Sequence, residues 1–114
     1  MAPFSAAIGA QDSAEVNGNA DASLIREAMP EISRFFGIVI SMYYSEHAPP
    51  HFHARYGDER ASIRIDDGEI LEGSLGRRAL RLVEEWRALH VAELQNDWQH
   101  AQVRAPLSKI EPLG

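Results

Sequence analysis

Two histidines separated by one residue are the groups in this chain best suited to chemistry. They lie in the run Pro49-Pro50-His51-Phe52-His53, directly after two rigid prolines. Residues at i and i+2 of a strand point to the same face of a sheet, so we expect His51 and His53 side by side. Imidazoles serve as general acids and bases, and they also bind metal ions. The spacing alone leaves both kinds of chemistry open.

The residues around the histidines predict a β-hairpin. Strands are expected over residues 51–56 and 59–65, joined by Gly57-Asp58, a dipeptide suited to a two-residue turn. Such a turn fixes the register, which puts apolar residues on one face of the hairpin and polar residues on the other. The polar side, here called the His/Arg face, is expected to hold His51, His53, Arg55, Arg60, Ser62 and Arg64, with Ser41 and Tyr43 from the preceding strand.

Two further strands extend this hairpin into a sheet. Residues 37–44 are rich in β-branched and aromatic side chains, which favour a strand. A short strand over residues 69–71 follows Asp67-Gly68, a favourable hairpin turn that would pair Ile70 with Ile65. We therefore predict an antiparallel sheet of three to four strands.

One long C-terminal helix is expected to cover the apolar side of this sheet. Ser74 is a plausible N-cap, Pro106 lies beyond the helix, and the helix is predicted over residues 75–102. Its apolar residues recur at helical spacing: Leu75, Ala79, Leu82, Val83, Trp86, Leu89, Leu94 and Trp98. The predicted fold class is α+β, with the last residues tucking back through Ile110 and Leu113.

Composition limits the kind of protein. The chain has 114 residues, enough for one domain, and no cysteine, which excludes disulfides and thiol chemistry. Residues 1–28 are rich in alanine with Phe4 as their one aromatic residue, so we expect a mobile extension before a single domain over residues 29–114. No run approaches the roughly 20 apolar residues of a membrane span. We expect a soluble, cytoplasmic protein.

An anion site is the first functional interpretation of the His/Arg face. The hairpin register sets Arg55 directly opposite Arg60, and like charges opposed across strands destabilise a sheet. A phosphate between them would relieve that cost, with Arg64 and Tyr43 as further contacts. The formal net charge of -6 argues against a protein whose whole surface binds nucleic acid. The alternative is the ordinary solvated side of a half-buried sheet.

The histidines leave two catalytic interpretations open. Metal-free RNA cleavage needs a base, an acid and a cation at the phosphate, which His51, His53 and the arginines would supply. A metal site needs a third ligand beside the two histidines, and the candidates are His47, Asp58 and Glu59. If a metal is bound, His47, His51 and His53 are the expected set; otherwise no cofactor is expected.

The chain also resembles a small bacterial family catalogued as domain of unknown function 4160, over residues 29–114. The motifs that carry the resemblance are Met29-Pro30-Glu31-Ile32-Ser33-Arg34-Phe35, Gly37-Ile38-Val39-Ile40, Pro49-Pro50-His51-Phe52-His53, Tyr56-Gly57, Leu71-Glu72-Gly73, Arg78-Ala79-Leu80 and Trp86 through Trp98. It implies a cytoplasmic bacterial protein encoded beside a second small protein, as half of a toxin–antitoxin pair. It implies no defined activity.

The function expected from these observations is that of one component of a toxin–antitoxin-like module. It would bind a partner protein or RNA phosphate through the His/Arg face, and it would associate with itself or with the neighbour-encoded protein through open sheet edges. A weaker similarity to small ribonuclease toxins of double-stranded-RNA-binding-like fold would give His51 or His53 the catalytic role. The alternatives are an interaction module with incidental histidines and a metal-dependent enzyme.

Overall fold

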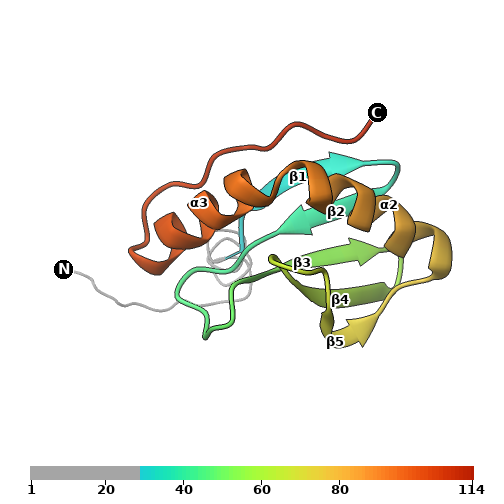
Figure 1. The fold of residues 1–114 in the computed structure, drawn as a ribbon, viewed down its shortest axis with the longest axis horizontal. Coiled ribbons are helices and arrows are strands. Elements are labelled where there is room, and N and C mark those ends of the chain that lie inside the picture. The colour runs from blue at the N-terminus through green and yellow to red at the C-terminus, as the bar shows by residue number, and fades with distance from the viewer. Residues whose placement is uncertain (1–28) are drawn as a thin grey trace, which may run out of the picture.

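A computed structural model describes residues 29–114, so the predicted extension over residues 1–28 lies outside the described residues. Within them the chain forms a five-stranded antiparallel sheet with the strands in chain order, followed by two helices on one face (Figure 1). The strands are β1 (Glu31–Phe35), β2 (Ile38–Ser41), β3 (His51–Tyr56), β4 (Glu59–Arg64) and β5 (Ile70–Ser74). The α+β class is confirmed.

The hairpin of β3 and β4 has the predicted register. His51 pairs with Arg64 and His53 with Ser62, and Arg55 lies directly opposite Arg60. The loop is the expected pair of residues, with Gly57 at a φ of 60°. A two-residue loop allows only one pairing of β3 with β4 that keeps the apolar residues on one face. The register of this hairpin could therefore be predicted from the sequence.

Strand β1 is an addition to the predicted sheet, and β2 is shorter than the predicted strand over residues 37–44. The two strands are joined by a tight turn in which Phe36 and Gly37 have φ angles of 50° and 81°. Positive φ at both central residues is the geometry of a type I′ hairpin turn. This turn brings Phe35 opposite Ile38, and Phe35 is buried with its ring 5.5 Å from that of Trp86.

The connection between β4 and β5 differs from the prediction. Ile70 pairs with Ile63, whereas the sequence suggested Ile65, and the pairing shifts register beside Ser62. The loop is longer than the predicted two residues. The Gly68 amide donates to the Arg64 carbonyl oxygen at 2.9 Å, which closes a wider turn.

The start of the first helix also differs from the prediction. Ser74 is the last residue of β5, so it is not the N-cap, and the helix begins after Gly76. The Gly76 amide instead donates to the Glu59 carboxylate at 2.7 Å, which satisfies one of the free donors at a helix start.

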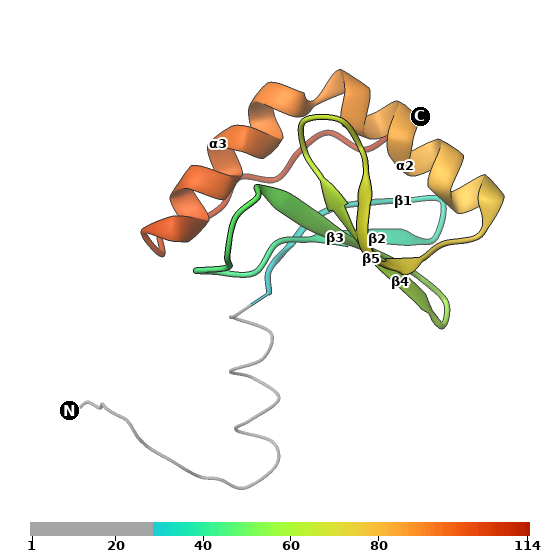
Figure 2. The same ribbon diagram turned by 60° about the horizontal axis from the view of Figure 1, so that its bottom comes forward.

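Two helices replace the single predicted helix over residues 75–102. They are α2 (Arg77–Leu89) and α3 (Val91–Gln102), separated by His90, whose φ and ψ of -129° and 28° are not helical. The break lets the two helices arch over the curved sheet (Figure 2). Leu89, a member of the predicted apolar stripe, is the last residue of α2 and is 67% exposed.

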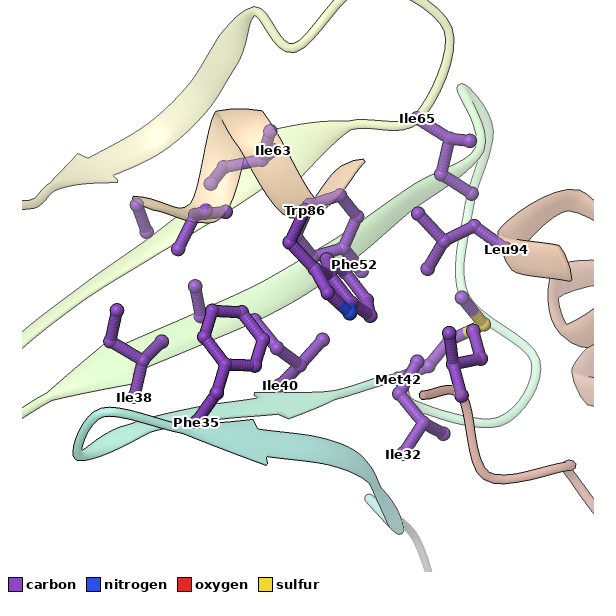
Figure 3. Packing of buried hydrophobic residues seen from close by; sticks show 14 of the residues in the cluster. Ile32, Phe35, Ile38, Ile40, Met42, Phe52, Ile63, Ile65, Trp86 and Leu94 are labelled. Carbon is purple, nitrogen blue, oxygen red and sulfur yellow. The ribbon is translucent and has the colours of Figure 1, made fainter. Parts of the chain in front are cut away.

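The core lies between the sheet and these helices (Figure 3). Trp86 is fully buried at its centre, with its ring 5.7 Å from that of Phe52 and near that of Phe35. Burying one large aromatic side chain contributes on the order of 2 kcal/mol or more. The prediction that helix covers the apolar face of the sheet is therefore confirmed.

The residues after α3 return along the helices to β1, as expected. The Ile110 amide donates to the Ile32 carbonyl oxygen at 2.8 Å, and the Trp86 indole Nε1–H donates to the Glu111 carbonyl oxygen at 2.9 Å. Ile110 is buried in the core and Leu113 packs against it. This segment supplies partners for β1, an edge strand of the sheet.

Candidate functional site

The two histidines of β3 converge on one carboxylate. Side chains alternate along the strand, so Phe52 enters the core while His51 and His53 lie on the other face. The Nε2 atom of His51 lies 2.9 Å from Oε1 of Glu46, and that of His53 lies 2.7 Å from the same oxygen. Glu46, His51 and His53, here called the His₂Glu cluster, form a compact group.

The loop between β2 and β3 positions Glu46. The neighbouring Ser45 has a φ of 58°, and its amide donates to the Ala101 carbonyl oxygen of α3 at 3.2 Å. At the other end of the loop, the Pro50 carbonyl oxygen accepts the Ile65 amide at 3.0 Å. Contacts to α3 and to the β4 end thus hold the loop against the histidines.

None of the three third ligands considered from the sequence lies in this cluster. His47 follows Glu46 but is exposed, and it does not belong to the group of ligand atoms formed by Glu46, His51 and His53. Asp58 and Glu59 belong to the turn end of the β3–β4 hairpin. Of the described His, Asp and Glu residues, Glu46 is the one that joins the two histidines.

The hydrogen bonds of His51 determine its tautomer. Its Nδ1 lies 2.7 Å from the Pro49 carbonyl oxygen, which can only accept, so Nδ1 carries the proton. In the neutral ring Nε2 then presents a lone pair to the Glu46 carboxylate. The close approach of two acceptors requires a proton shared between the nitrogen and the carboxylate oxygen, or a metal ion between them. His51 is buried, and its ring lies 5.2 Å from that of Trp98.

His53 is held on both sides. Its Nδ1 lies 3.2 Å from the Ser62 hydroxyl, and its ring stacks on Tyr43 with 4.2 Å between centroids. The hydroxyl both donates and accepts, so it accommodates either tautomer of this ring. Tyr43 therefore lies beside His53, as expected if β2 pairs with β3, and Ser41 pairs directly with His53.

A pocket of about 440 Å³ opens beside the cluster, over β3 and β4. Arg55 and Arg60 are both exposed and line it together with Tyr43 and His53. Among residues 29–114, the ion pairs within 4.0 Å do not include either arginine. The charged groups that line the pocket are therefore the two guanidinium groups, Glu46 and His53 of the His₂Glu cluster, and the carboxylate of Glu72.

Arg64 is placed differently from the other two arginines. Its guanidinium donates to the Asp67 carboxylate at 2.9 and 2.7 Å and also contacts Glu69. The hydrogen bond from Arg64 holds the pKa of Asp67 well below its usual range. Arg64 belongs to the expected His/Arg face by register, but its charge is matched by two carboxylates of the β4–β5 loop.

The remaining histidines lie apart from this cluster. His90 contacts Glu93 at the helix break, with its ring 5.5 Å from that of Trp86. The Nδ1–H of His100 donates to the Asn96 carbonyl oxygen at 2.9 Å.

Comparison with known proteins identifies the family without giving an activity. Within residues 29–114, no helix has the length and apolar character needed to cross a membrane. No curated protein and no solved structure matches the chain. A family model described as domain of unknown function matches residues 37–99, which covers more than half of the chain and includes the whole candidate site. The chain therefore belongs to the family of the domain of unknown function DUF4160.

Proposed function

We propose that the protein binds RNA, a phosphate-bearing ligand, in the pocket that Arg55 and Tyr43 line. The observation that carries the proposal is the pair Arg55 and Arg60, opposed across two strands and exposed to one pocket. Like charges at directly opposed positions destabilise a sheet, and a bound phosphate offsets that repulsion. Guanidinium groups suit this role because they bind phosphate oxygens in a bidentate manner.

The size and lining of the pocket agree with a nucleotide-sized group. A volume of about 440 Å³ lies within the usual range for small-ligand sites. The aromatic ring of Tyr43 lies at its wall, where a base can stack against an aromatic side chain. These features favour a single-stranded ligand over a duplex.

The charge of the whole chain limits the affinity. At a formal net charge of -6, the general attraction of a basic protein for nucleic acid is missing. Binding would rest on two arginines, so only a few counterions would be released when RNA binds. The affinity should therefore decrease only moderately as the salt concentration rises. We expect weak binding at physiological salt and measurable binding at low salt.

Fluorescence anisotropy with a labelled single-stranded RNA tests the proposal. The variants Arg55→Ala and Arg60→Ala should each weaken binding and reduce the salt slope by about 0.7, the contribution of one phosphate contact on a single strand. Arg81→Ala is the matched control, because Arg81 is exposed on α2, across the sheet from the pocket. Equal losses in all three variants would point to general electrostatics and reject the pocket.

The proposal is limited to binding, without cleavage. Metal-free cleavage requires a base on the attacking side of the phosphate and an acid on the leaving side, the roles that the two imidazoles would fill. In the described structure His51 and His53 both direct Nε2 to the same oxygen of Glu46, so neither is free for that role. RNA cleavage by the parent protein in chelator, lost in His51→Ala or His53→Ala, would extend the proposal to a metal-independent ribonuclease.

A second proposal concerns a partner protein. Strand β5 is the edge of the sheet, it is largely exposed, and Leu71 on it is 37% exposed. Edge strands offer unpaired backbone groups to another chain. We propose that a small neighbour-encoded protein, or a second copy, pairs there as in a toxin–antitoxin module. Sedimentation of the protein alone and co-expressed with its neighbour tests this, and a strict monomer in both samples would reject it.

A further inference from the structure

We infer that Glu46, His51 and His53 form a binding site for a divalent transition-metal ion, with zinc as the expected ion. Two imidazoles and one carboxylate are the protein ligands of a well-known class of open metal sites. One atom from each residue lies within 4.8 Å of the other two. This inference concerns a different ligand from the proposed RNA and stands without it.

The hydrogen bonds behind the cluster support metal binding. A metal-binding histidine usually donates its second ring N–H to a carbonyl, carboxylate or hydroxyl oxygen, which fixes the tautomer. His51 does this to the Pro49 carbonyl oxygen at 2.7 Å, and His53 has the Ser62 hydroxyl at 3.2 Å. With the proton on Nδ1, the tautomer that Pro49 requires for His51 and that Ser62 accommodates for His53, both Nε2 atoms direct lone pairs toward Oε1 of Glu46. Three lone pairs that face one point are the arrangement that a cation stabilises.

The distances require only a small expansion. The two Nε2 atoms lie 2.9 and 2.7 Å from the Glu46 oxygen, which are hydrogen-bond lengths. Ligand bonds of about 2.0–2.1 Å in a tetrahedral zinc site separate neighbouring ligand atoms by about 3.3 Å. The side chain of Glu46 belongs to a loop and is 26% exposed, so it can move outward by the difference between these two sets of distances. The rings keep their places, because Trp98 and Tyr43 pack against them.

The cluster also has access for an ion and room for further ligands. Glu46 and His53 line the pocket of about 440 Å³, and all three cluster residues line a second pocket of about 270 Å³ on the loop side. With three protein ligands, a tetrahedral ion keeps one position for water or a substrate oxygen. Because Glu46 and His53 line the same pocket as Arg55 and Arg60, a phosphate bound by these arginines would lie next to the cluster.

Calorimetric titration of the full chain with Zn²⁺, after dialysis against chelator, tests the inference. We expect one Zn²⁺ per chain, together with a rise in melting temperature. Glu46→Gln should weaken zinc binding at least about tenfold. Loss of a residue that only hydrogen-bonds to a metal ligand lowers the affinity by about that factor, and loss of a direct ligand should cost no less. This variant keeps an amide that can donate to Nε2 of His51 through its NH₂ group or accept from His53 through its oxygen, so the fold should persist.

The matched control is His47→Ala, which removes the exposed neighbouring histidine and should leave zinc affinity unchanged. A wild-type measurement avoids variants altogether: in ¹⁵N spectra of the histidine side chains, Zn²⁺ should shift Nε2 of His51 and His53 but not the signals of His90 or His100. No zinc binding by the parent protein, or equal affinity in Glu46→Gln, would overturn the inference. Loss of binding in His47→Ala would also overturn it, since that residue is outside the cluster.

Discussion

Asp97 is the one carboxylate among the described residues that is completely buried. Its Oδ1 accepts the Ser108 amide at 2.9 Å, which ties the C-terminal segment to α3, while Oδ2 has no hydrogen-bond partner. Burial raises the pKa of Asp97 above its ordinary value, because an ionised carboxylate loses its hydration there. The hydrogen bond from Ser108 opposes this shift, but the neutral form remains favoured relative to the unfolded chain.

The Asp97→Asn variant should change how stability depends on pH. Because the pKa of Asp97 is higher in the folded state, folding is favoured while the group is protonated, and this contribution is lost as pH rises through the raised pKa. Asparagine keeps an oxygen for Ser108 and never ionises. In urea denaturation, the variant should therefore gain stability relative to wild type on going from about pH 4 to about pH 7.

The control for this prediction is Glu85→Gln, which neutralises an exposed carboxylate on α2. Its difference from wild type should stay nearly constant over the same range of pH. An Asp97→Asn curve that runs parallel to wild type would show that Asp97 ionises equally easily in both states.

Also at the scale of single residues, the sequence identified the two histidines but not Glu46. A two-residue period along a strand places His51 and His53 together, whereas nothing periodic fixes a loop residue. Glu46 reaches the cluster because the loop folds back against α3. The arginines show the same limit. Their positions in the β3–β4 register were predicted correctly, but the pairing of Arg64 with loop carboxylates depends on the geometry of the β4–β5 turn, which the sequence did not predict.

At the scale of elements, β5 depends on a close backbone approach at Gly73. This glycine has a φ of 77° and lies opposite Ala61. An added Cβ would lie 2.2 Å from the carbonyl oxygen of Arg60, far inside van der Waals contact with backbone. Gly73 therefore helps to hold the strand that carries one of the two pocket arginines.

The Gly73→Ala variant should destabilise the fold and displace β5. Positive φ alone costs a non-glycine residue about 1–2 kcal/mol, and the overlap with Arg60 adds to that cost. Gly57→Ala is a matched control, since Gly57 also has positive φ but an added Cβ meets nothing within 4 Å. Urea denaturation should give a clearly larger loss for Gly73→Ala. Equal losses would mean that the backbone contact contributes nothing.

The elements were predictable where a short turn and an alternating pattern agreed. The β3–β4 hairpin meets both conditions, and its register was correct in every pair. Strand β1 was missed because its turn, Phe36-Gly37, contains a bulky residue at positive φ, which is uncommon. The break at His90 was missed because the apolar spacing continues across it, and only the curvature of the sheet requires two helices.

At the scale of the whole molecule, the helices and the C-terminal segment cover one side of the sheet (Figure 2). The pocket arginines Arg55 and Arg60, opposed in the β3–β4 register, belong to the other side. The described core extends from Ile32 in β1 to Ile110 in the C-terminal segment, and we propose that residues 29–114 form the folded domain. A chain starting at Met29 should accordingly unfold cooperatively with a melting temperature near that of the full chain. A large drop on removing residues 1–28 in calorimetry would contradict the proposed domain boundary.

The most direct test of the central proposal is to locate the ligand on the open face of the sheet. In ¹H–¹⁵N spectra of the full chain, titration with a short single-stranded RNA at low salt should shift the amides of Arg55, Arg60 and Tyr43 most strongly. The amides of α2, including that of Arg81, should stay in place. Shifts confined to the helices, or none at saturating RNA, would contradict the assignment of this pocket as the phosphate-binding site.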